Sequence, residues 1–543
     1  MADIPARSDL ETHSVHNQPG VPAPRDLWRS DAALQDHALA LGGSEGALAS
    51  VGAAYGTAEL AQAALQARRD PPRLISHDAA GRRLDEVAFH PGYHQILSTG
   101  VQQGYVAGAW ETGGGGHLAH AVHVYMLTQV EPGCCCPLTM SYAAQAALAK
   151  APELQALWGQ KLLSRRYDPR VRPVTEKAGV TMGMAMTEKQ GGSDLRRSET
   201  RAEADEDGLY RLYGHKWFCS APMSDGFLTL AQSDGGLSAF MVPRWLEGER
   251  NGISLIALKP KLGNHANASA EIEFDDALAA RIGDEGAGLS VIMQMVHHTR
   301  LDTAMAPAGL MRAALRVAYH WVCRRKAFGA TLIDQPLMQA VLADLVLDAE
   351  GALALGLHMA QLMDNPDADD QALARLGVAL AKFLNNKRCV PVVAEALEML
   401  GGSGYVERSV LPMLYREAPL NGLWEGASNV ICLDVLRSLQ KLPRAAPALA
   451  AYLDSATGRD PLFDMALRIH RKRWPSLPEE AEARWFAESL ASLMTGAALL
   501  KTAPQVIAEA YVATRLSSTR GSIAGAVGTR DLRHILHRLD ARA

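Results

Sequence analysis

The spacing of apolar residues along this 543-residue chain changes twice. From about residue 32 to residue 180, and again from residue 288 onward, apolar residues recur every three or four positions, which predicts amphipathic helices. Between residues 181 and 282 apolar and polar residues alternate, and glycine-containing turns interrupt them at short intervals. Such alternation predicts short, mostly antiparallel strands. We therefore expect a mainly α-helical protein with a central β-domain.

Turn and proline signals set the expected domain boundaries. We expect an N-terminal helical domain at residues 1–182, the β-domain at 183–283 and a helical bundle at 284–442. Pro443 follows the last bundle helix, and proline commonly ends a helix. Residues 443–543 are therefore expected to form a C-terminal helical extension. Within the first domain, the glycines at 113–116 predict a flexible connector.

Composition and charge limit the classes of function. Apolar residues make up 48% of the chain and charged residues 21%, as in ordinary soluble globular proteins. The formal net charge of −5 excludes nucleic-acid binding driven by overall charge, but it allows a local basic face. Residues 444–543 hold 14 Lys and Arg against 10 Asp and Glu, a balance of +4, so the rest of the chain carries −9. Of these two parts, only the C-terminal one has the sign of charge that attracts phosphate.

The cysteines and the N-terminus are those expected of a cytoplasmic protein. Cys134, Cys135 and Cys136 are contiguous, so they lack the C-x-x-C spacing of a zinc knuckle, and nothing resembles a disulfide framework. The first residues lack the basic start and apolar segment of a secretory signal, and no apolar run reaches the ~18 residues of a membrane span. We expect no membrane partner, and we expect the proline-rich residues 1–30 to form an irregular surface arm.

Two groups of histidines have spacings that invite a metal-site interpretation. His90 and His94 have the i, i+4 spacing of a helical metal pair, but a Pro-Gly pair between them argues against a helix there. His117 and His123 fall on different faces of a predicted helix, because each residue turns by about 100°. We therefore expect no metal site.

A glycine-rich loop is the first candidate for a cofactor site. Residues 184–194 (MAMTEKQGGSD) follow an apolar run that predicts a strand, and they place two glycines between Thr187 and Ser193. Glycines let backbone N–H groups approach a ligand closely, and the two hydroxyls lie at the ends of the loop. The loop therefore suits a phosphate-bearing cofactor, although a sequence of this kind taken alone is more often a simple turn.

A glutamate after a second glycine cluster is the candidate for a catalytic base. Residues 401–405 (GGSGY) precede residues 415–429 (YREAPLNGLWEGASN), in which Glu425 lies between Trp424 and Gly426. An apolar neighbour can desolvate a carboxylate and raise its pKa, which suits proton abstraction. Taken alone, the same triplet also fits the start of a helix with a solvated glutamate.

In this order, the blocks 184–194, 401–405 and 415–429 resemble the acyl-CoA dehydrogenase superfamily, whose members hold FAD and oxidise thioesters. The resemblance implies the fold of that superfamily, with an N-terminal helical domain, an antiparallel barrel-like β-domain and a C-terminal helical bundle, here followed by an extra helical region. It implies that Glu425 is the base that removes the α proton and that FAD accepts the hydride. Residues 136–144 resemble a helix start in the N-terminal domain.

The resemblance also assigns FAD contacts residue by residue. In an Arg-x-x-Phe-Gly element at residues 325–329, it implies that the arginine meets a pyrophosphate across a subunit interface, a role that suits the bidentate geometry of arginine. The complete expected set is Met184, Met186, Thr187, Gly192, Ser193, Phe218, Ser220, Arg325, Phe328, Gln335, Gly401, Gly402 and Asn429.

Some positions depart from the superfamily pattern. Arg197 stands where a small residue is usual, Ala427 replaces a threonine after Glu-Gly, and His265 occupies a position often held by arginine. Thr299 occupies the position at which one branch carries its base, so Glu425 has no competitor there. These departures leave FAD binding expected and point away from ordinary acyl-CoA processing.

Further blocks resemble one branch of the superfamily, the AidB-like proteins. These are residues 12–19 (THSVHNQP), 81–85 (GRRLD) and 393–396 (VAEA), together with the C-terminal extension. The resemblance implies an FAD-containing homotetramer of the adaptive response to DNA alkylation that binds double-stranded DNA without sequence specificity. It also implies a retained dehydrogenase-like site with weak activity on an acyl-CoA-like small molecule.

The C-terminal extension carries basic residues that fit phosphate contacts, which depend on local charge. Three glutamates at 479, 480 and 482 interrupt them, and no base-reading motif is present, so DNA contacts are expected to be backbone-directed. A solvated amphipathic helix is the alternative interpretation. The residues expected to bind DNA are Arg468, Arg471, Lys472, Arg473, Arg515 and Arg520.

Two other functions stay open at this point. The first is an ordinary catabolic dehydrogenase for short or branched acyl-CoA, with Glu425 as base, FAD as acceptor and a decorative extension. The second is a non-enzymatic scaffold that keeps FAD as a structural element.

Overall fold

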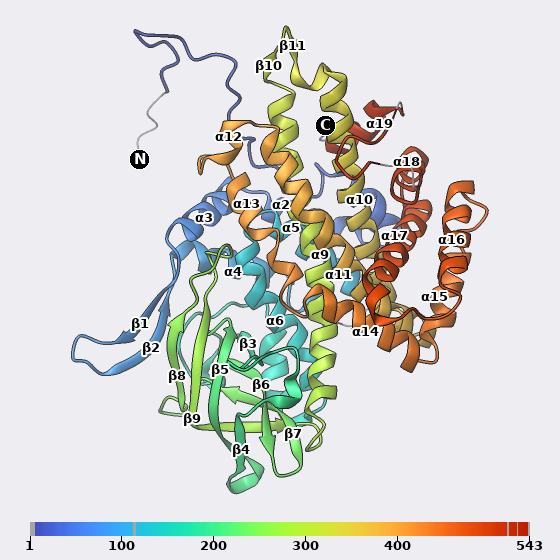
Figure 1. Cartoon of the computed structure of the whole chain (residues 1–543). Coiled ribbons are helices and arrows are strands. Elements are labelled where there is room, and N and C mark those ends of the chain that lie inside the picture. The colour runs from blue at the N-terminus through green and yellow to red at the C-terminus, as the bar shows by residue number, and fades with distance from the viewer. Residues whose placement is uncertain (1–5, 112–115, 518–520, 529, 541–543) are drawn as a thin grey trace.

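The computed structural model describes residues 6–111, 116–517, 521–528 and 530–540, so part of the expected connector at 113–116 lies outside the described residues. Helices occupy the upper and right-hand parts of the view in Figure 1, and a β-domain occupies the lower left. The longest helix, α9, runs from the β-domain to the opposite end of the molecule (Figure 1). It therefore forms the axis along which the other parts are arranged.

The N-terminal region begins with an arm without regular secondary structure and continues as packed helices with one protruding hairpin. The hairpin of β1 and β2 turns at Asp78, whose carboxylate accepts backbone N–H groups of Ala80 and Arg82. The elements are α1 (Ala32–Ala40), α2 (Glu45–Tyr55), α3 (Ala58–Arg69), β1 (Arg73–His77), β2 (Arg83–Ala88), α4 (Pro91–Gln103), α5 (Gly116–Thr128), α6 (Pro132–Leu148), α7 (Pro152–Leu154) and α8 (Gln160–Leu162).

Two helix starts differ from the sequence-based expectation for the same reason. α4 begins at Pro91 and α6 begins at Pro132, four residues before the start expected at Cys136. Proline is accepted in the first turn because its missing N–H has no partner within the helix there. The preceding side chains, His90 and Glu131, cap the two helices by accepting N–H groups of the first turn. His90 is therefore a cap and does not share a helical face with His94.

The β-domain is a seven-stranded sheet that closes on itself, because β5 pairs with β9 as well as with β3 and β4. Its pairings are antiparallel except that β6 runs parallel to β3 and β4. A separate apolar core fills it. The strands are β3 (Met182–Ala185), β4 (Arg201–Ala204), β5 (Tyr210–Ser220), β6 (Gly226–Ser233), β7 (Gly236–Pro243), β8 (Ile253–Leu258) and β9 (Ser269–Ile282).

The bundle that follows packs three long helices against one another, α9, α10 and α11. A small hairpin of β10 and β11 links α9 to α10 at the end of the molecule farthest from the β-domain (Figure 1). The elements are α9 (Gly288–Val322), β10 (Lys326–Ala327), β11 (Ala330–Thr331), α10 (Pro336–Asp364), α11 (Ala368–Glu398), α12 (Gly402–Tyr405), α13 (Leu411–Glu417) and α14 (Ser428–Lys441).

The C-terminal region is not a decoration on the bundle, because its side chains belong to the same continuous apolar core. α17 packs against α10 and α11, and a Cβ added at Gly351 of α10 would approach Tyr511 to 2.8 Å. The whole region covers one side of the bundle (Figure 1). Its helices are α15 (Ala445–Asp454), α16 (Pro461–Arg473), α17 (Ala483–Thr502), α18 (Gln505–Arg515) and α19 (Leu532–Leu536).

Buried ion pairs fasten this region to the helices beneath it. Arg515 at the end of α18 pairs with Asp344 and Asp348 of α10, at 2.5 and 3.0 Å, and its side chain is only 1% exposed. Arg538 pairs with Glu350 of α10 at 2.7 Å and with Asp36 of α1 at 2.6 Å. Since an unpaired buried charge is costly, these pairs require the C-terminal region to stay docked.

We predict that Arg515→Met lowers the free energy of unfolding by about 3–5 kcal/mol, because the positive charge that Asp344 and Asp348 pair with in the interior is removed. The matched control is Arg471→Met, which removes an ion pair to Asp454 at 2.8 Å whose side chains are both about half exposed. This control should change the stability by no more than about 1 kcal/mol. Urea denaturation of both variants provides the comparison, and equal small losses would contradict the docking account.

Candidate functional site

Glu425 lies in the short loop between α13 and α14, directly before the start of α14 at Ser428. Its backbone is left-handed, with φ of +58°, and the next residue, Gly426, has φ of +103°. Left-handed backbone is unfavourable for a glutamate and persists only where surrounding contacts impose it. The position of the carboxyl group therefore depends on what holds this loop.

Two buried cations hold the loop through its backbone carbonyls. Arg300 of α9 donates from Nε to the carbonyl of Glu425 at 3.0 Å. Lys382 of α11 donates from Nζ to the carbonyls of Asn421 and Gly426, both at 2.9 Å. Arg300 is itself fixed by Asp434 of α14 at 2.7 Å. Helices from three parts of the bundle thus determine where Glu425 lies.

The electrostatic setting of Glu425 favours a neutral carboxyl group more than water does. Burial raises its pKa above the ordinary value, and the negative charge of Asp302 adds to this effect. Hydrogen bonding with Thr299 and the positive charges of Arg300 and Lys382 partly oppose it. Burial also lowers the pKa of Lys382, to about 7. The raised pKa agrees with the expectation for a desolvated base at this position.

The predicted flavin residues of the β-domain come together on two neighbouring strands. Met184 on β3 lies opposite Ser220 on β5, and the backbone of Thr187 accepts the N–H of Trp217 at 2.7 Å. Phe218 on the same strand is 48% exposed, and Lys259 Nζ lies 4.7 Å from the centre of its ring. The structure therefore brings Met184, Met186, Thr187, Phe218 and Ser220 into one area.

A buried ion pair closes the glycine-rich loop. Glu188 accepts Lys216 Nζ at 2.7 Å and the N–H groups of Glu199 and Thr200. Although burial opposes ionisation, the charge of Lys216 and these hydrogen bonds lower the pKa of Glu188 to about 2. Gly192 lies so close to Thr187 that an added Cβ would be 2.3 Å from the hydroxyl oxygen. Gly192 and Ser193 are thereby kept beside Thr187.

All the remaining predicted flavin residues except Asn429 belong to the β10–β11 hairpin and to the segments that begin α10 and α12. Arg325 and Phe328 belong to the β10–β11 hairpin, and Gln335 precedes α10 and donates to the carbonyl of Ala327 at 3.0 Å. Gly401, with φ of +58°, and Gly402 begin α12, and no atom lies within 4 Å of a Cβ added at either one. These backbones are therefore open to a ligand.

One chain does not bring the two groups together. α6 links the β-domain group to Glu425. Ser141 on α6 accepts the N–H of Met182 at 3.0 Å. Burial raises the pKa of Cys136 on α6 to about 11, and the nearby charge of Glu425 contributes to that rise. Arg300 beside Glu425 precedes the end of α9 at Val322 by 22 residues. At 1.5 Å per residue, roughly 33 Å of helix separates the Glu425 loop from the hairpin end of α9.

Asn429 connects the loop of Glu425 with the C-terminal region. It lies on the first turn of α14, and its side-chain oxygen accepts Arg484 Nη1 of α17 at 2.9 Å. Arg515 was predicted to bind DNA, and this prediction is wrong. Its buried guanidinium is already paired with two aspartates and cannot reach phosphate. Arg520 lies outside the described residues.

The other four predicted DNA-binding residues lie on the last two turns of α16, and all are exposed. Arg468, Arg471 and Lys472 share one face, because a helix turns by about 100° per residue. Arg473 is turned away from this face, with its guanidinium 3.3 Å from the ring centre of Trp485. The exposed face of α16 therefore carries three cations, of which Arg471 is paired with the half-exposed Asp454 at 2.8 Å.

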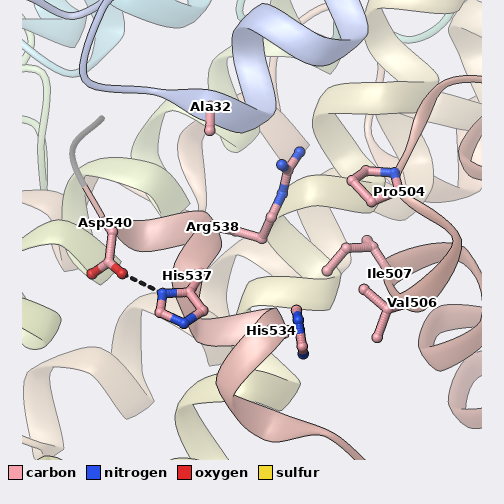
Figure 2. Close-up of a pocket in the computed structure, with 8 residues that line it drawn as sticks. All are labelled: Ala32, Pro504, Val506, Ile507, His534, His537, Arg538 and Asp540. Atoms are coloured by element: carbon pink, nitrogen blue, oxygen red, sulfur yellow. Dashed lines mark hydrogen bonds and ion pairs between the residues drawn. The ribbon is translucent and has the colours of Figure 1, made fainter. Parts of the chain in front are cut away.

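A cavity of about 310 Å³ lies elsewhere, between α1 and the C-terminal region (Figure 2). Figure 2 shows His534 and His537 among the residues that line this cavity, and His537 forms a hydrogen bond with Asp540. None of the expected flavin residues lines it, so it is separate from the candidate site. In the part of the chain that the structure describes, no group of three potential ligands fits a metal ion, and no helix is long and apolar enough to cross a membrane.

Known proteins match this chain along most of its length. Residues 17–169 match the N-terminal domain of the adaptive response protein AidB, residues 183–277 the middle domain of acyl-CoA dehydrogenases and residues 286–440 their C-terminal domain. The chain is 43% identical over 520 residues to AidB of Escherichia coli (strain K12), which covers 94% of this chain and 96% of that protein. The chain belongs to the AidB-like branch of the acyl-CoA dehydrogenase family. This confirms the predicted family, fold class and FAD as its cofactor.

Other AidB-like and dehydrogenase relatives agree with this assignment. Acyl-CoA dehydrogenase family member 11 of Caenorhabditis elegans is 34% identical over 401 residues, covering 70% of this chain and 64% of that protein. The crystal structure of Caenorhabditis elegans ACDH-11 in complex with C11-CoA has a TM-score of 0.82 at 27% identity, covering 94% of this chain and 93% of that one. The extra helical region is therefore shared by a solved structure and is not peculiar to this chain.

Sequence reasoning missed the residues that hold this AidB-like site in place. Lys382 lies in the middle of a long helix, and its position there gives no signal of a role. Lys216 does give one, because it occupies a core-facing position in the alternating pattern of β5, where Leu212 is also buried. A buried lysine requires a paired acid, and Glu188 is that acid.

We predict that Glu188→Gln destabilises the protein by about 3–5 kcal/mol near pH 7, because Lys216 is left buried without its partner. The pKa of Glu188 is about 2 in the folded state against 4.5 as its ordinary value, so the pair stabilises fully above pH 4.5 and less as the pH falls toward 2. The difference in unfolding free energy between wild type and variant should shrink over this range. A difference independent of pH would contradict the assignment.

Proposed function

We propose that this chain is an FAD-dependent oxidoreductase of the acyl-CoA dehydrogenase type, and that Glu425 removes the α proton of a thioester. The observation that carries the proposal is the loop of Glu425, which two buried cations hold in an otherwise unfavourable backbone conformation. Strain of this kind is found where a side chain must point in a defined direction. The complex of the Caenorhabditis elegans relative with C11-CoA supports a thioester as the class of substrate.

The residues present fit FAD. The half-exposed aromatic ring of Phe218 suits stacking, the hydroxyls of Thr187 and Ser220 can form hydrogen bonds to the flavin edge, and the backbone at Gly401 is open to a nucleotide. Arg325 supplies a charge-assisted donor for a pyrophosphate. When bound, FAD supplies the two-electron acceptor for the hydride that leaves the β carbon.

The chemistry assigned to the protein is the proton transfer. Glu425 acts as a carboxylate, takes the α proton and becomes neutral, and its raised pKa makes it a stronger base than an ordinary glutamate. Thr299 occupies the position at which another branch carries its base. It cannot replace Glu425 as the base, since a threonine hydroxyl does not take up a proton at neutral pH.

The separation of the flavin residues along α9 supports an assembly of at least two copies. One copy supplies Thr187, Ser193 and Phe218, and another supplies Arg325, Gln335 and Gly401 to the same FAD. The exposed apolar side chains of Phe328, Leu337 and Tyr405, which are 99%, 76% and 79% exposed, lie in or beside the second group. A homotetramer, as in the family, provides such a contact.

We predict that Glu425→Gln slows bleaching of the bound flavin by a short branched acyl-CoA by about 10²- to 10⁴-fold, because the general base is lost. Stopped-flow absorbance measures the rate, and flavin content confirms that the site is loaded. Glu398→Gln, at the exposed last residue of α11, is the control, and its flavin should bleach at the wild-type rate. If no thioester bleaches the flavin of wild-type protein that is fully loaded with FAD, the alternative of a scaffold with FAD as a structural element would be favoured instead.

We further propose that the protein acts in the response to DNA alkylation and binds double-stranded DNA without sequence specificity. The observation that favours this second role is the exposed face of Arg468, Arg471 and Lys472 on α16, in a region of net positive charge. Phosphate contacts need no base-reading element, and an oligomer repeats the face. A cytoplasmic location is part of this proposal.

We predict that replacing Arg468, Arg471 and Lys472 by alanine weakens duplex binding at low salt and lowers the slope of log affinity against log salt by about 0.9 per residue removed. Fluorescence anisotropy with two unrelated duplexes measures both quantities. The control replaces three exposed arginines of the N-terminal region by alanine. They lie in and beside α3, β1 and β2 and are Arg69, Arg73 and Arg82. Equal losses for the two triple variants, or none for either, would remove the assignment of DNA to α16.

A further inference from the structure

The N-terminal arm lies against the hairpin that carries Arg325. The side-chain amide of Asn17 donates from Nδ2 to the carbonyl of Lys326 at 2.8 Å and accepts the N–H of Lys326 on Oδ1 at 2.7 Å. One side chain thus satisfies both backbone groups of Lys326 at the edge of the hairpin, as a neighbouring strand would. Asn17 and Lys326 are 309 residues apart, so this is a specific long-range contact.

The same short segment also holds the side chain of Arg325. Nη1 of Arg325 donates to the carbonyl oxygen of Asn17 and to Oε1 of Gln18, the second at 3.1 Å. Asn17 adopts a left-handed backbone with φ of +53°, which asparagine tolerates better than most residues. This conformation allows the carbonyl and the side-chain amide of Asn17 to reach the hairpin together.

The bonds from the arm leave part of the guanidinium available. A guanidinium has five N–H donors, and the hydrogen bonds of Arg325 within the described residues use Nη1. The Nε and Nη2 groups form the edge that binds a phosphate through two parallel hydrogen bonds. The arm therefore fixes the arginine by one nitrogen and keeps a bidentate edge open.

We propose that Asn17 and Gln18 are positioning residues for FAD, which hold Arg325 and the β10–β11 hairpin where the arginine meets the pyrophosphate. The proposal rests on the function proposed above, in which Arg325 binds that group. A long arginine side chain loses conformational freedom when it binds, and fixing it beforehand reduces that entropic cost. Gln335 donates to the carbonyl of Ala327, the residue after Lys326 on β10, so side chains from two separate segments hold this strand.

Competition between the arm and FAD for Arg325 would be the opposite of positioning, and the two roles predict opposite changes in FAD affinity. If the arm competed with the pyrophosphate for Arg325, removing its contacts would strengthen FAD binding. If the arm positions Arg325, removing them weakens FAD binding. The sign of the change therefore separates the two roles in one titration.

The test uses the full-length protein after removal of its flavin. The double variant Asn17→Gly, Gln18→Ala removes the side-chain contacts, and glycine keeps the left-handed backbone at residue 17 without strain. Titration with FAD, followed by flavin fluorescence, should give roughly three- to tenfold weaker binding. Val21→Ala, at a 76% exposed position of the same arm, is the matched control and should bind as wild type does.

A double-mutant cycle with Arg325→Met shows whether the arm acts through the arginine. In that background the arm substitutions should have no further effect on FAD affinity. Hydrogen exchange at the Lys326 amide, which Asn17 protects, should rise in the arm variant while the thermal midpoint stays within a few degrees.

Unchanged or tighter FAD binding in the arm variant, with the Lys326 amide deprotected, would overturn the positioning role and leave the flavin function intact. Unchanged FAD binding in Arg325→Met would instead show that Arg325 does not meet the nucleotide, and the function proposed above would lose that contact together with this inference.

Discussion

The candidate site depends on two buried cations that bind backbone carbonyls of the Glu425 loop. Arg300 and Lys382 come from two long helices, and both donate hydrogen bonds to backbone carbonyls of the loop. Their positive charges partly oppose the rise in the pKa of Glu425 that burial causes. A direct ion pair would lower the pKa of the carboxyl group and weaken it as a base. Bonds to the carbonyls fix the position of the side chain while burial still raises its pKa. The loop is therefore held in place while the net pKa of Glu425 stays above its ordinary value.

The same principle, a buried charge that fixes a backbone segment, recurs through the molecule. Lys216 and Glu188 close the glycine-rich loop, and Arg515 and Arg538 attach the C-terminal helices to α10. Each pair is costly to break because one charge would remain buried alone. The C-terminal region is consequently part of the structure that supports α10 and α11, and through Lys382 on α11 it supports the candidate site as well. Arg484, which contacts Asn429, adds a direct link between the two.

The periodicity of apolar residues was sufficient to predict the helical and β-rich segments, because each face of an element must meet a core. Motif order was sufficient to predict the family. The helix start at Pro91 was missed because proline was taken as a breaker where it stands in a first turn. The start at Pro132 lies four residues before the one that the resemblance at residues 136–144 implies. Arg515 was assigned to DNA because a sequence shows charge but not burial. Lys382 and Asn17 act through contacts with residues far along the chain, which no local pattern reveals.

The claim that Lys382 holds the Glu425 loop is tested most directly with the variant Lys382→Met. The rate at which an acyl-CoA bleaches its flavin is measured as a function of pH, after its FAD content has been verified. The bleaching rate of this variant should be at least about tenfold lower than that of wild type, since the general base is displaced. Its apparent pKa should also be shifted upward, because the positive charge that lowers the pKa of Glu425 is gone. A variant that retains FAD and gives the wild-type rate and pH profile would contradict the claim that Lys382 holds the catalytic loop.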